Sequence, residues 1–183
     1  MERRLAIKQI LIMAGGLALL PSCLREAGKA SIQLKNIVVN LDQELLLAEI
    51  AETIIPKTNT PGAKDLKLHL FVLKMLDDCH DEKDQQLFLK GLDRLKDLAQ
   101  EQYSSSFANM TVADRQKLLI HLEEMKVKDV KGQKDDDELS TFYSIMKRRT
   151  LGGFLNSKYV MSNITKWELV PGRYNGYYPV KSA

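Results

Sequence analysis

Few residues of this chain have side chains suited to chemistry, and they are scattered. The 183 residues include two cysteines and three histidines. One run, Asp77-Asp78-Cys79-His80-Asp81, brings together carboxylates, a thiol and an imidazole, which are metal-binding groups. Five consecutive residues do not converge easily on one ion, and hard carboxylates with a soft thiol suit no single metal well. We therefore interpret the run as a solvated helix end and predict no metal site.

The motifs that hold redox cofactors or build active sites are also missing from the sequence. Two cysteines form neither a Cys-x-x-Cys-His haem site nor a four-thiolate cluster. The sequence has no glycine-rich phosphate loop, and its histidines have no nucleophile nearby. The formal net charge of +3, two of which come from the first eight residues, is too small for a nucleic-acid-binding surface. We expect no catalytic, cofactor-binding or metal-binding residue here.

The first 22 residues indicate an export signal. A basic head containing Arg3 and Arg4 precedes an apolar run, residues 10–20, that is shorter than the ~20 residues needed to span a bilayer. The two arginines resemble a twin-arginine signal, which exports folded proteins, although neighbouring positions depart from the usual pattern and leave the general secretory route open. Leu20-Pro21-Ser22-Cys23 resembles a bacterial lipobox. We predict lipidation at Cys23, in preference to a plain cleaved signal, and a periplasmic lipoprotein anchored to the membrane.

Cys79 would then be an odd thiol in an oxidising compartment. It is expected either to be buried or to form an intermolecular disulfide. Of the two, we favour burial.

The segments that would position these residues are mainly helical. Apolar residues recur at helical spacing before Pro56 and over about residues 66–78, 84–103, 112–125 and 138–149. Asn40 or Asp42 can cap the first of these helices, and Asp65 the second. The predicted fold class is mainly α, a small domain of about five helices at 41–149. A tether at 23–40 precedes it, and an extended C-terminal arm at 150–183, rich in aromatic residues, glycine and proline, follows it.

The last of these helices carries cations where it is expected to end. Lys147, Arg148 and Arg149 fall at its predicted C-terminal end, where positive charge is stabilising. We interpret them as partners of the helix dipole, in preference to a contact for an acidic partner surface.

The connection between the first two helices, Glu52 to Asp65, is polar and stiff. Pro56 cannot continue a helix, and Pro61-Gly62 predicts a second turn in which glycine is free to take a positive φ. Thr58 and Thr60 can bond nearby backbone groups. By itself such a loop is read as an ordinary connection between two helices.

The C-terminal arm differs from the helices before it. It holds six of the twelve aromatic residues, and its glycines and prolines exclude a long helix. Tyrosine and tryptophan are enriched at the energetic centres of protein interfaces. We expect the arm to bind a partner or to wrap over the helices, and one chain could do both.

Together these two segments resemble the signature of the gluconate 2-dehydrogenase subunit 3 family. The first half of the resemblance is A-E-x-I-I-P-x-T-x-T-P-G-A at Ala51 to Ala63, and the second lies in the arm up to Pro179. The residues assigned to the family motif or to partner binding are Glu52, Ile55, Pro56, Thr58, Thr60, Pro61, Gly62, Phe142, Tyr143, Thr150, Gly153, Phe154, Tyr159, Trp167, Pro171, Gly172, Tyr174 and Tyr177.

The resemblance implies a small, non-catalytic subunit of a membrane-associated sugar dehydrogenase. Its partner would be a larger flavoprotein of the glucose-methanol-choline type, which carries FAD, and a c-type cytochrome with haem c would accept the electrons. The subunit would assist export, stability and membrane attachment of the flavoprotein. The alternative is a free-standing lipoprotein that binds carbohydrate through its aromatic arm or acts as a scaffold.

Overall fold

The computed structural model describes residues 28–129, 137–165, 167–168, 170, 172 and 175–177. Its helices are α2 (Leu41–Ile54), α3 (Leu68–Cys79), α4 (Glu82–Tyr103), α5 (Val112–Asp129) and α6 (Asp137–Leu155). Two short helices, the 3₁₀ helix η1 (Phe107–Asn109) and the π-helix η2 (Val160–Ile164), complete the described elements. The predicted mainly α fold is confirmed.

Local sequence accounts for most of the helix ends. Asn40, one of the two caps that the sequence predicts, caps α2, and it also forms a capping box with Gln43. Pro56 follows the end of α2, and Ser104 terminates α4 in the left-handed conformation with φ 50°. The predicted cap at Asp65 is wrong, because α3 begins later, after Lys67, which has φ 51°. Asp65 instead accepts a hydrogen bond from the Gly62 N–H.

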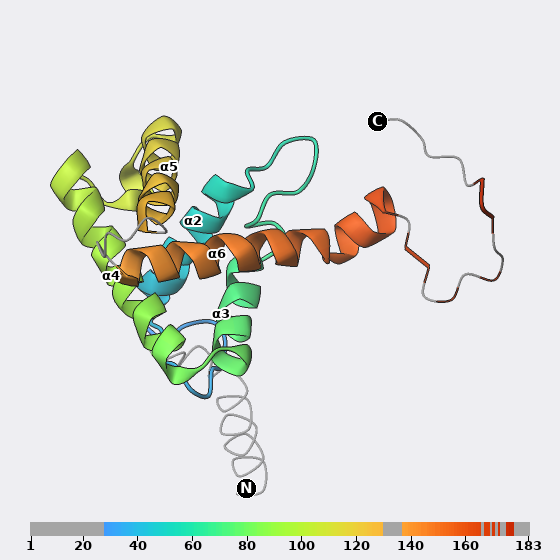
Figure 1. Ribbon diagram of the computed structural model, residues 1–183, viewed down its shortest axis with the longest axis horizontal. Coiled ribbons are helices and arrows are strands. Elements are labelled where there is room, and N and C mark those ends of the chain that lie inside the picture. The colour runs from blue at the N-terminus through green and yellow to red at the C-terminus, as the bar shows by residue number, and fades with distance from the viewer. Residues whose placement is uncertain are drawn as a thin grey trace, which may run out of the picture.

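The core lies where α6 crosses the other helices (Figure 1). α6 packs most extensively on α4 and α3 and also contacts α5 and α2. At the centre of the α4–α6 contact, the rings of Phe88 and Phe142 lie 4.9 Å apart and both side chains are fully buried. Gly91 permits this approach: a Cβ there would lie 2.9 Å from the Glu138 carbonyl carbon and closer still to the Phe142 Cβ.

α6 extends past the end that the sequence predicts near Arg149. It continues to Leu155, so Thr150, Gly153 and Phe154 are helical rather than extended. Beyond the crossing, its last part and η2 project away from the other helices (Figure 1). The two adjacent glycines, Gly152 and Gly153, do not stop the helix, because Gly153 packs directly against α3.

The segment before α2 is fastened to the helices by two buried carboxylates. The side chain of Asp77 accepts backbone N–H groups of Lys35, Asn36 and Ile37 at 2.7–3.2 Å. Glu44 accepts the N–H and hydroxyl of Ser31. Residues 28–40, which the sequence assigns to the tether, therefore pack on α2 and α3.

Candidate partner-binding surface

The loop between α2 and α3, residues 55–67, is held by the carboxylate of Glu52 and is called the Glu52 loop below. Glu52 lies in the last turn of α2. Its Oε1 accepts the backbone N–H of Lys57 at 2.9 Å, and its Oε2 accepts that of Lys64 at 2.8 Å. One side chain thus joins the two arms of the loop, and each bond is charge-assisted.

Gly62 is needed here for a reason other than the predicted one. Its φ is not positive, so conformational freedom does not select glycine. A Cβ at this position would lie 2.7 Å from the Glu52 Oε2 and the Lys57 nitrogen, and closer still to the Glu52 Oε1. Glycine is therefore required because the carboxylate occupies the space that a side chain would fill.

Backbone hydrogen bonds close the loop at its neck and at its tip. The Ala63 N–H donates to the Ile55 carbonyl at 2.9 Å, which brings together the residues next to Pro56 and Gly62. At the tip, the Thr58 N–H donates to the Thr60 carbonyl at 3.1 Å, and their hydroxyls lie 3.4 Å apart. Pro56 and Thr58 are exposed. The loop is thus an internally bonded turn with an exposed tip.

Glu49 connects the same loop to the body of the protein. Its carboxylate pairs with the Lys64 ammonium and, at 2.8 Å, with the Arg115 guanidinium of α5. Burial alone would raise the pKa of Glu49, but the hydrogen bonds and charges of Lys64 and Arg115 outweigh it and lower that pKa. The Glu49 and Arg115 side chains are partly buried, which reduces solvent screening of their attraction.

The second half of the motif meets the first through α3. A Cβ at Gly153 would lie 2.7 Å from the Phe71 Cδ1 and 3.4 Å from the Leu68 Cδ2. Leu68 is the first residue of α3, directly after the Glu52 loop, and its N–H donates to the Ala63 carbonyl at 2.9 Å. Thr150, one turn before Gly153, is fully buried. Residues 51–63 and 150–154 therefore converge at the start of α3.

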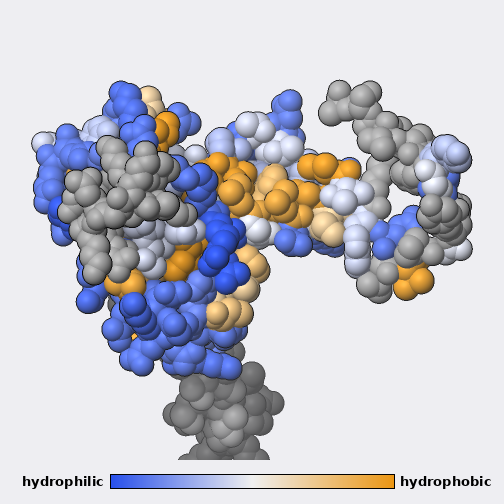
Figure 2. All heavy atoms as spheres, viewed as in Figure 1, coloured by the Kyte–Doolittle hydropathy of each residue, from blue (hydrophilic) through white to orange (hydrophobic). Residues whose placement is uncertain are grey.

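Large apolar side chains are exposed on α3, on the last turns of α6 and on the segment after it. Leu151 and Leu155, four residues apart on α6, are 40% and 59% exposed, and Phe71 of α3 is 39% exposed. Ile164 and Trp167 follow on η2 and after it, at 57% and 55%. Figure 2 shows hydrophobic residues along the part of α6 that leaves the helical body. We call these five residues the α6-end surface.

Phe142 and Tyr143, which the sequence assigns to the family motif or to partner binding, lie in the core. Phe142 is fully buried against Phe88, and Tyr143 is 5% exposed. Burial, with a contribution from the nearby Glu123 carboxylate, raises the pKa of Tyr143 to about 12. Both side chains pack into the helical body rather than outward.

The remaining residues of the assignment are distributed along the end of the chain. Tyr159 and Phe154 are half-buried, whereas Gly172 and Tyr177 are exposed, Tyr177 at 96%. Arg3, Arg4, Cys23, Pro171 and Tyr174 lie outside the described residues.

The expectation of a buried Cys79 is wrong. Its side chain is exposed at the end of α3 and is a free thiol. The prediction of an intermolecular disulfide stays open.

The interpretation of residues 77–81 as a solvated helix end is also wrong in part. Asp77 is 1% exposed, and the side chain of His80 is 5% exposed. His80 lies 3.0 Å from Asp84 through Nδ1, and its Nε2 accepts a hydrogen bond from the Arg149 guanidinium at 2.9 Å. Within the described ranges, no group of three His, Cys, Asp or Glu side chains is placed to hold a metal ion.

The interpretation of Arg149 as a partner of the α6 dipole is wrong as well. Arg149 lies inside the helix and binds His80. Only a long-range contact reveals this role, so the sequence offers no signal for it.

A family model described as gluconate 2-dehydrogenase subunit 3 matches residues 41–172, which include the Glu52 loop and the α6-end surface. No curated protein and no solved structure matches the chain.

Proposed function

Because this chain belongs to the gluconate 2-dehydrogenase subunit 3 family, we propose that it is the non-catalytic small subunit of a sugar dehydrogenase complex. It docks on a larger flavoprotein of the glucose-methanol-choline type. FAD is held by that partner, and a c-type cytochrome accepts the electrons. The observation that carries the proposal is the α6-end surface, whose large apolar side chains are exposed mainly on the end of α6 and the segment after it, where the second half of the family motif lies.

The physical argument for docking is the cost of leaving this surface in water. Burying a leucine side chain contributes about 1.5–3 kcal/mol, and apolar and aromatic side chains form the buried centre of protein interfaces. Leu151 and Leu155 stand side by side at helical spacing. Gly153 lies between these leucines in the sequence, and its contact with Leu68 fixes this part of α6 against the residue that follows the Glu52 loop.

Export and membrane attachment are further parts of the proposal. Arg3 and Arg4 carry the subunit and the folded flavoprotein together across the membrane, and lipid on Cys23 anchors the complex in the periplasm. A flavin must be inserted before export, which favours a route for folded cargo. No helix in the described part of the chain is long and apolar enough to cross a bilayer.

Co-purification with the flavoprotein of the same organism tests the docking. Replacing Leu151 and Leu155 by Asp should weaken binding about 100-fold, because each substitution forces a charge into the interface. Ile120→Asp is the matched control, since Ile120 is 58% exposed but lies on α5. Equal retention of the flavoprotein by wild type and the double variant would refute the docking surface.

A carbohydrate-binding lipoprotein remains the second candidate. The exposed Trp167 and Tyr177 favour it, since aromatic rings stack on sugars. Isothermal titration of the isolated chain with gluconate and glucose separates the two functions. Binding that is lost in Trp167→Ala would support the second candidate, and no heat of binding would support the accessory subunit.

A further inference from the structure

Exposed apolar side chains gather where the described part of the chain begins. Gly28, its first residue, accepts the backbone N–H of Leu41 at 2.9 Å, and Lys29 forms an antiparallel β-bridge with Asn40. The beginning of the described chain is therefore joined to the start of α2. Three large apolar side chains near this junction are exposed and are called the N-terminal surface below: Val38 at 89%, Leu41 at 37% and Leu45 at 55%.

Val38 is held outward by its neighbours in the chain. Ile37 and Val39, on either side of it, are each 6% exposed and belong to the core. Asp77 binds the backbone N–H groups of residues 35–37. The backbone is therefore fixed and these donors are paired within the protein, so the segment can approach an apolar phase without leaving them unsatisfied.

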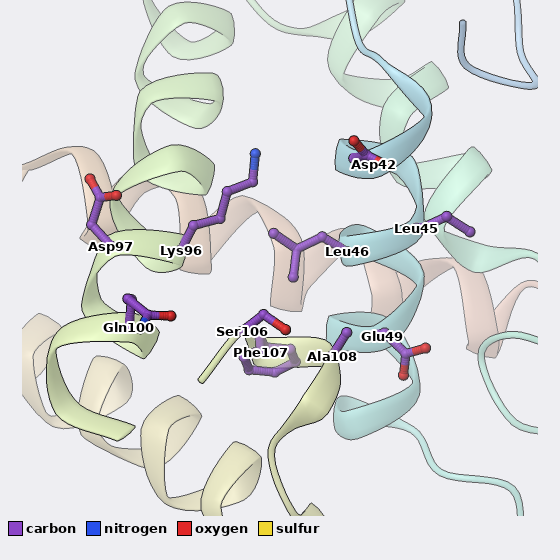
Figure 3. Close-up of a pocket in the computed structure, with 10 residues that line it drawn as sticks. All are labelled: Asp42, Leu45, Leu46, Glu49, Lys96, Asp97, Gln100, Ser106, Phe107 and Ala108. Carbon is purple, nitrogen blue, oxygen red and sulfur yellow. The ribbon is translucent and has the colours of Figure 1, made fainter. Parts of the chain in front are cut away.

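Leu41 and Leu45 continue the N-terminal surface onto α2. They lie four residues apart and therefore on one face of the helix. In Figure 3 the Leu45 side chain points away from α4, whereas that of Leu46 points toward it. Leu46 is 8% exposed, so the two adjacent leucines divide between the core and the surface.

The charges beside the N-terminal surface are mixed. Lys29 and Lys35 are exposed cations, and Asp42 is an exposed anion in the first turn of α2. Anionic lipid headgroups attract the two lysines and repel Asp42. Apolar contact rather than charge is therefore the main attraction that this surface offers to a bilayer.

The lipid proposed at Cys23 limits how far the N-terminal surface can lie from a membrane. Five residue steps separate Cys23 from Gly28, and a fully extended chain of that length spans at most about 18 Å. The headgroup layer on one side of a bilayer is about 5–8 Å thick. Gly28 must therefore lie close to the headgroups, and Leu41 is bonded directly to it.

We propose that the N-terminal surface lies on the bilayer that holds the Cys23 lipid, with Val38 and Leu45 at the boundary between headgroups and acyl chains. The inference rests on the lipid anchor of the proposed function. The apolar face of a peripheral helix lies about 5–10 Å into this boundary. A single acyl chain binds a membrane only reversibly, so an apolar contact beside it strengthens the attachment. Because the surface is rigid, it also fixes which face of the protein meets the lipid.

This orientation leaves the docking surface for the flavoprotein accessible. Residues 35–37 bond to Asp77 near the end of α3, whereas Gly153 packs on Leu68 at its start. Figure 1 shows α5 and the last turns of α6 away from residues 28–40. A bilayer under the N-terminal surface therefore does not cover the α6-end surface.

Fluorescence quenching in vesicles tests the proposal on the full lipoprotein. Cys79→Ser removes the exposed thiol, so that a label reacts with an introduced cysteine. A nitrobenzoxadiazole label is attached to Val38→Cys, to Leu45→Cys or to the matched control Ile120→Cys, which is 58% exposed on α5. The vesicles contain phosphatidylethanolamine, phosphatidylglycerol and a lipid with a nitroxide on its acyl chain. Quenching at positions 38 and 45 should be about threefold stronger or more than at position 120, because these labels lie near the acyl chains.

Mass spectrometry of the same protein separates this inference from the proposed anchor. A chain without lipid on Cys23 would overturn both. Lipid on Cys23 with equal quenching at positions 38 and 120 would overturn the inference alone, and the anchor would stand. Labels at positions 38 and 45 that are shielded from aqueous iodide only after the flavoprotein is added would assign the surface to a protein partner and would likewise overturn the contact with lipid.

Discussion

Gly62→Ala tests the interpretation that the Glu52 carboxylate fills the place of a side chain. The new Cβ would lie 2.7 Å from the Glu52 Oε2 and from the Lys57 nitrogen. The carboxylate must leave, and the hydrogen bonds to Lys57 and Lys64 break with it. Each such bond contributes about 0.5–1.5 kcal/mol at a partly exposed site. With the strain on the Lys57 backbone, the free energy of unfolding should fall by about 2–3 kcal/mol.

Glu52→Ala supplies the second arm of a double-mutant cycle. Alone it removes the same two hydrogen bonds and should cost about 1–2 kcal/mol. In the double variant the added Cβ at position 62 no longer meets a carboxylate, so the combined cost should be smaller than the sum of the two by about 1 kcal/mol or more.

Urea unfolding followed by circular dichroism measures all four proteins. The midpoint should shift while the dependence on urea stays constant. Strictly additive costs would refute the interpretation, because Gly62 and Glu52 would then stabilise the loop independently.

Three further predictions concern the helical body. Asp77→Asn should destabilise the protein by about 2–3 kcal/mol and speed hydrogen exchange at residues 35–37, whose N–H groups lose their carboxylate acceptor. Unchanged exchange at these residues would contradict the conclusion that Asp77 holds the segment 28–40 on α3. Burial alone would raise the pKa of Asp77, but those N–H groups outweigh it and lower that pKa. The stability that the Asp77 carboxylate contributes is therefore full above the unfolded pKa of ~3.9 and is lost as pH falls through the lower folded pKa. The acid unfolding curve of Asp77→Asn should lack this component. Gly91→Ala should cost about 2–3 kcal/mol by forcing α4 from α6 at Glu138 and Phe142, with a melting temperature below that of Gly152→Ala, where the added Cβ meets nothing within 4 Å. Because the pKa of Tyr143 is raised from 10.0 to about 12, the stability of the protein should decline as pH rises from 10 to 12. Glu123→Gln should lower the pKa of Tyr143, measured by ultraviolet absorbance, without returning it to 10, because burial is the larger cause. A pKa unchanged by the substitution would remove Glu123 as a cause.

Features with short-range causes can be predicted from the sequence. The helical fold, the cap at Asn40, the end of α2 before Pro56 and the break after Tyr103 depend on residues only a few positions apart. The stretch from Glu52 to Asp65 is likewise recognisable from its own residues. Its connection to Gly153 needs the family resemblance, because the two segments are far apart in the sequence and meet through Leu68 and Phe71 of α3.

Features with long-range causes escape prediction from the sequence. A positive φ is expected at Gly62, whereas this glycine makes room for the carboxylate of Glu52. Asp77 looks solvated in the sequence because nothing local shows that residues 35–37 donate to it. The end predicted for α6 is too early, because two adjacent glycines weaken a helix locally. In the structure the helix continues through them, since the close packing against α3 favours a glycine at position 153.

Photo-crosslinking from Leu155 tests the central claim, that the α6-end surface is where the dehydrogenase flavoprotein docks. A benzophenone amino acid replaces Leu155, and in a matched protein it replaces Ile120, which is equally exposed on α5. After illumination of the co-expressed complex, we expect a covalent adduct with the flavoprotein from position 155 and none from position 120. Adducts from position 120 but not from position 155 would contradict the account.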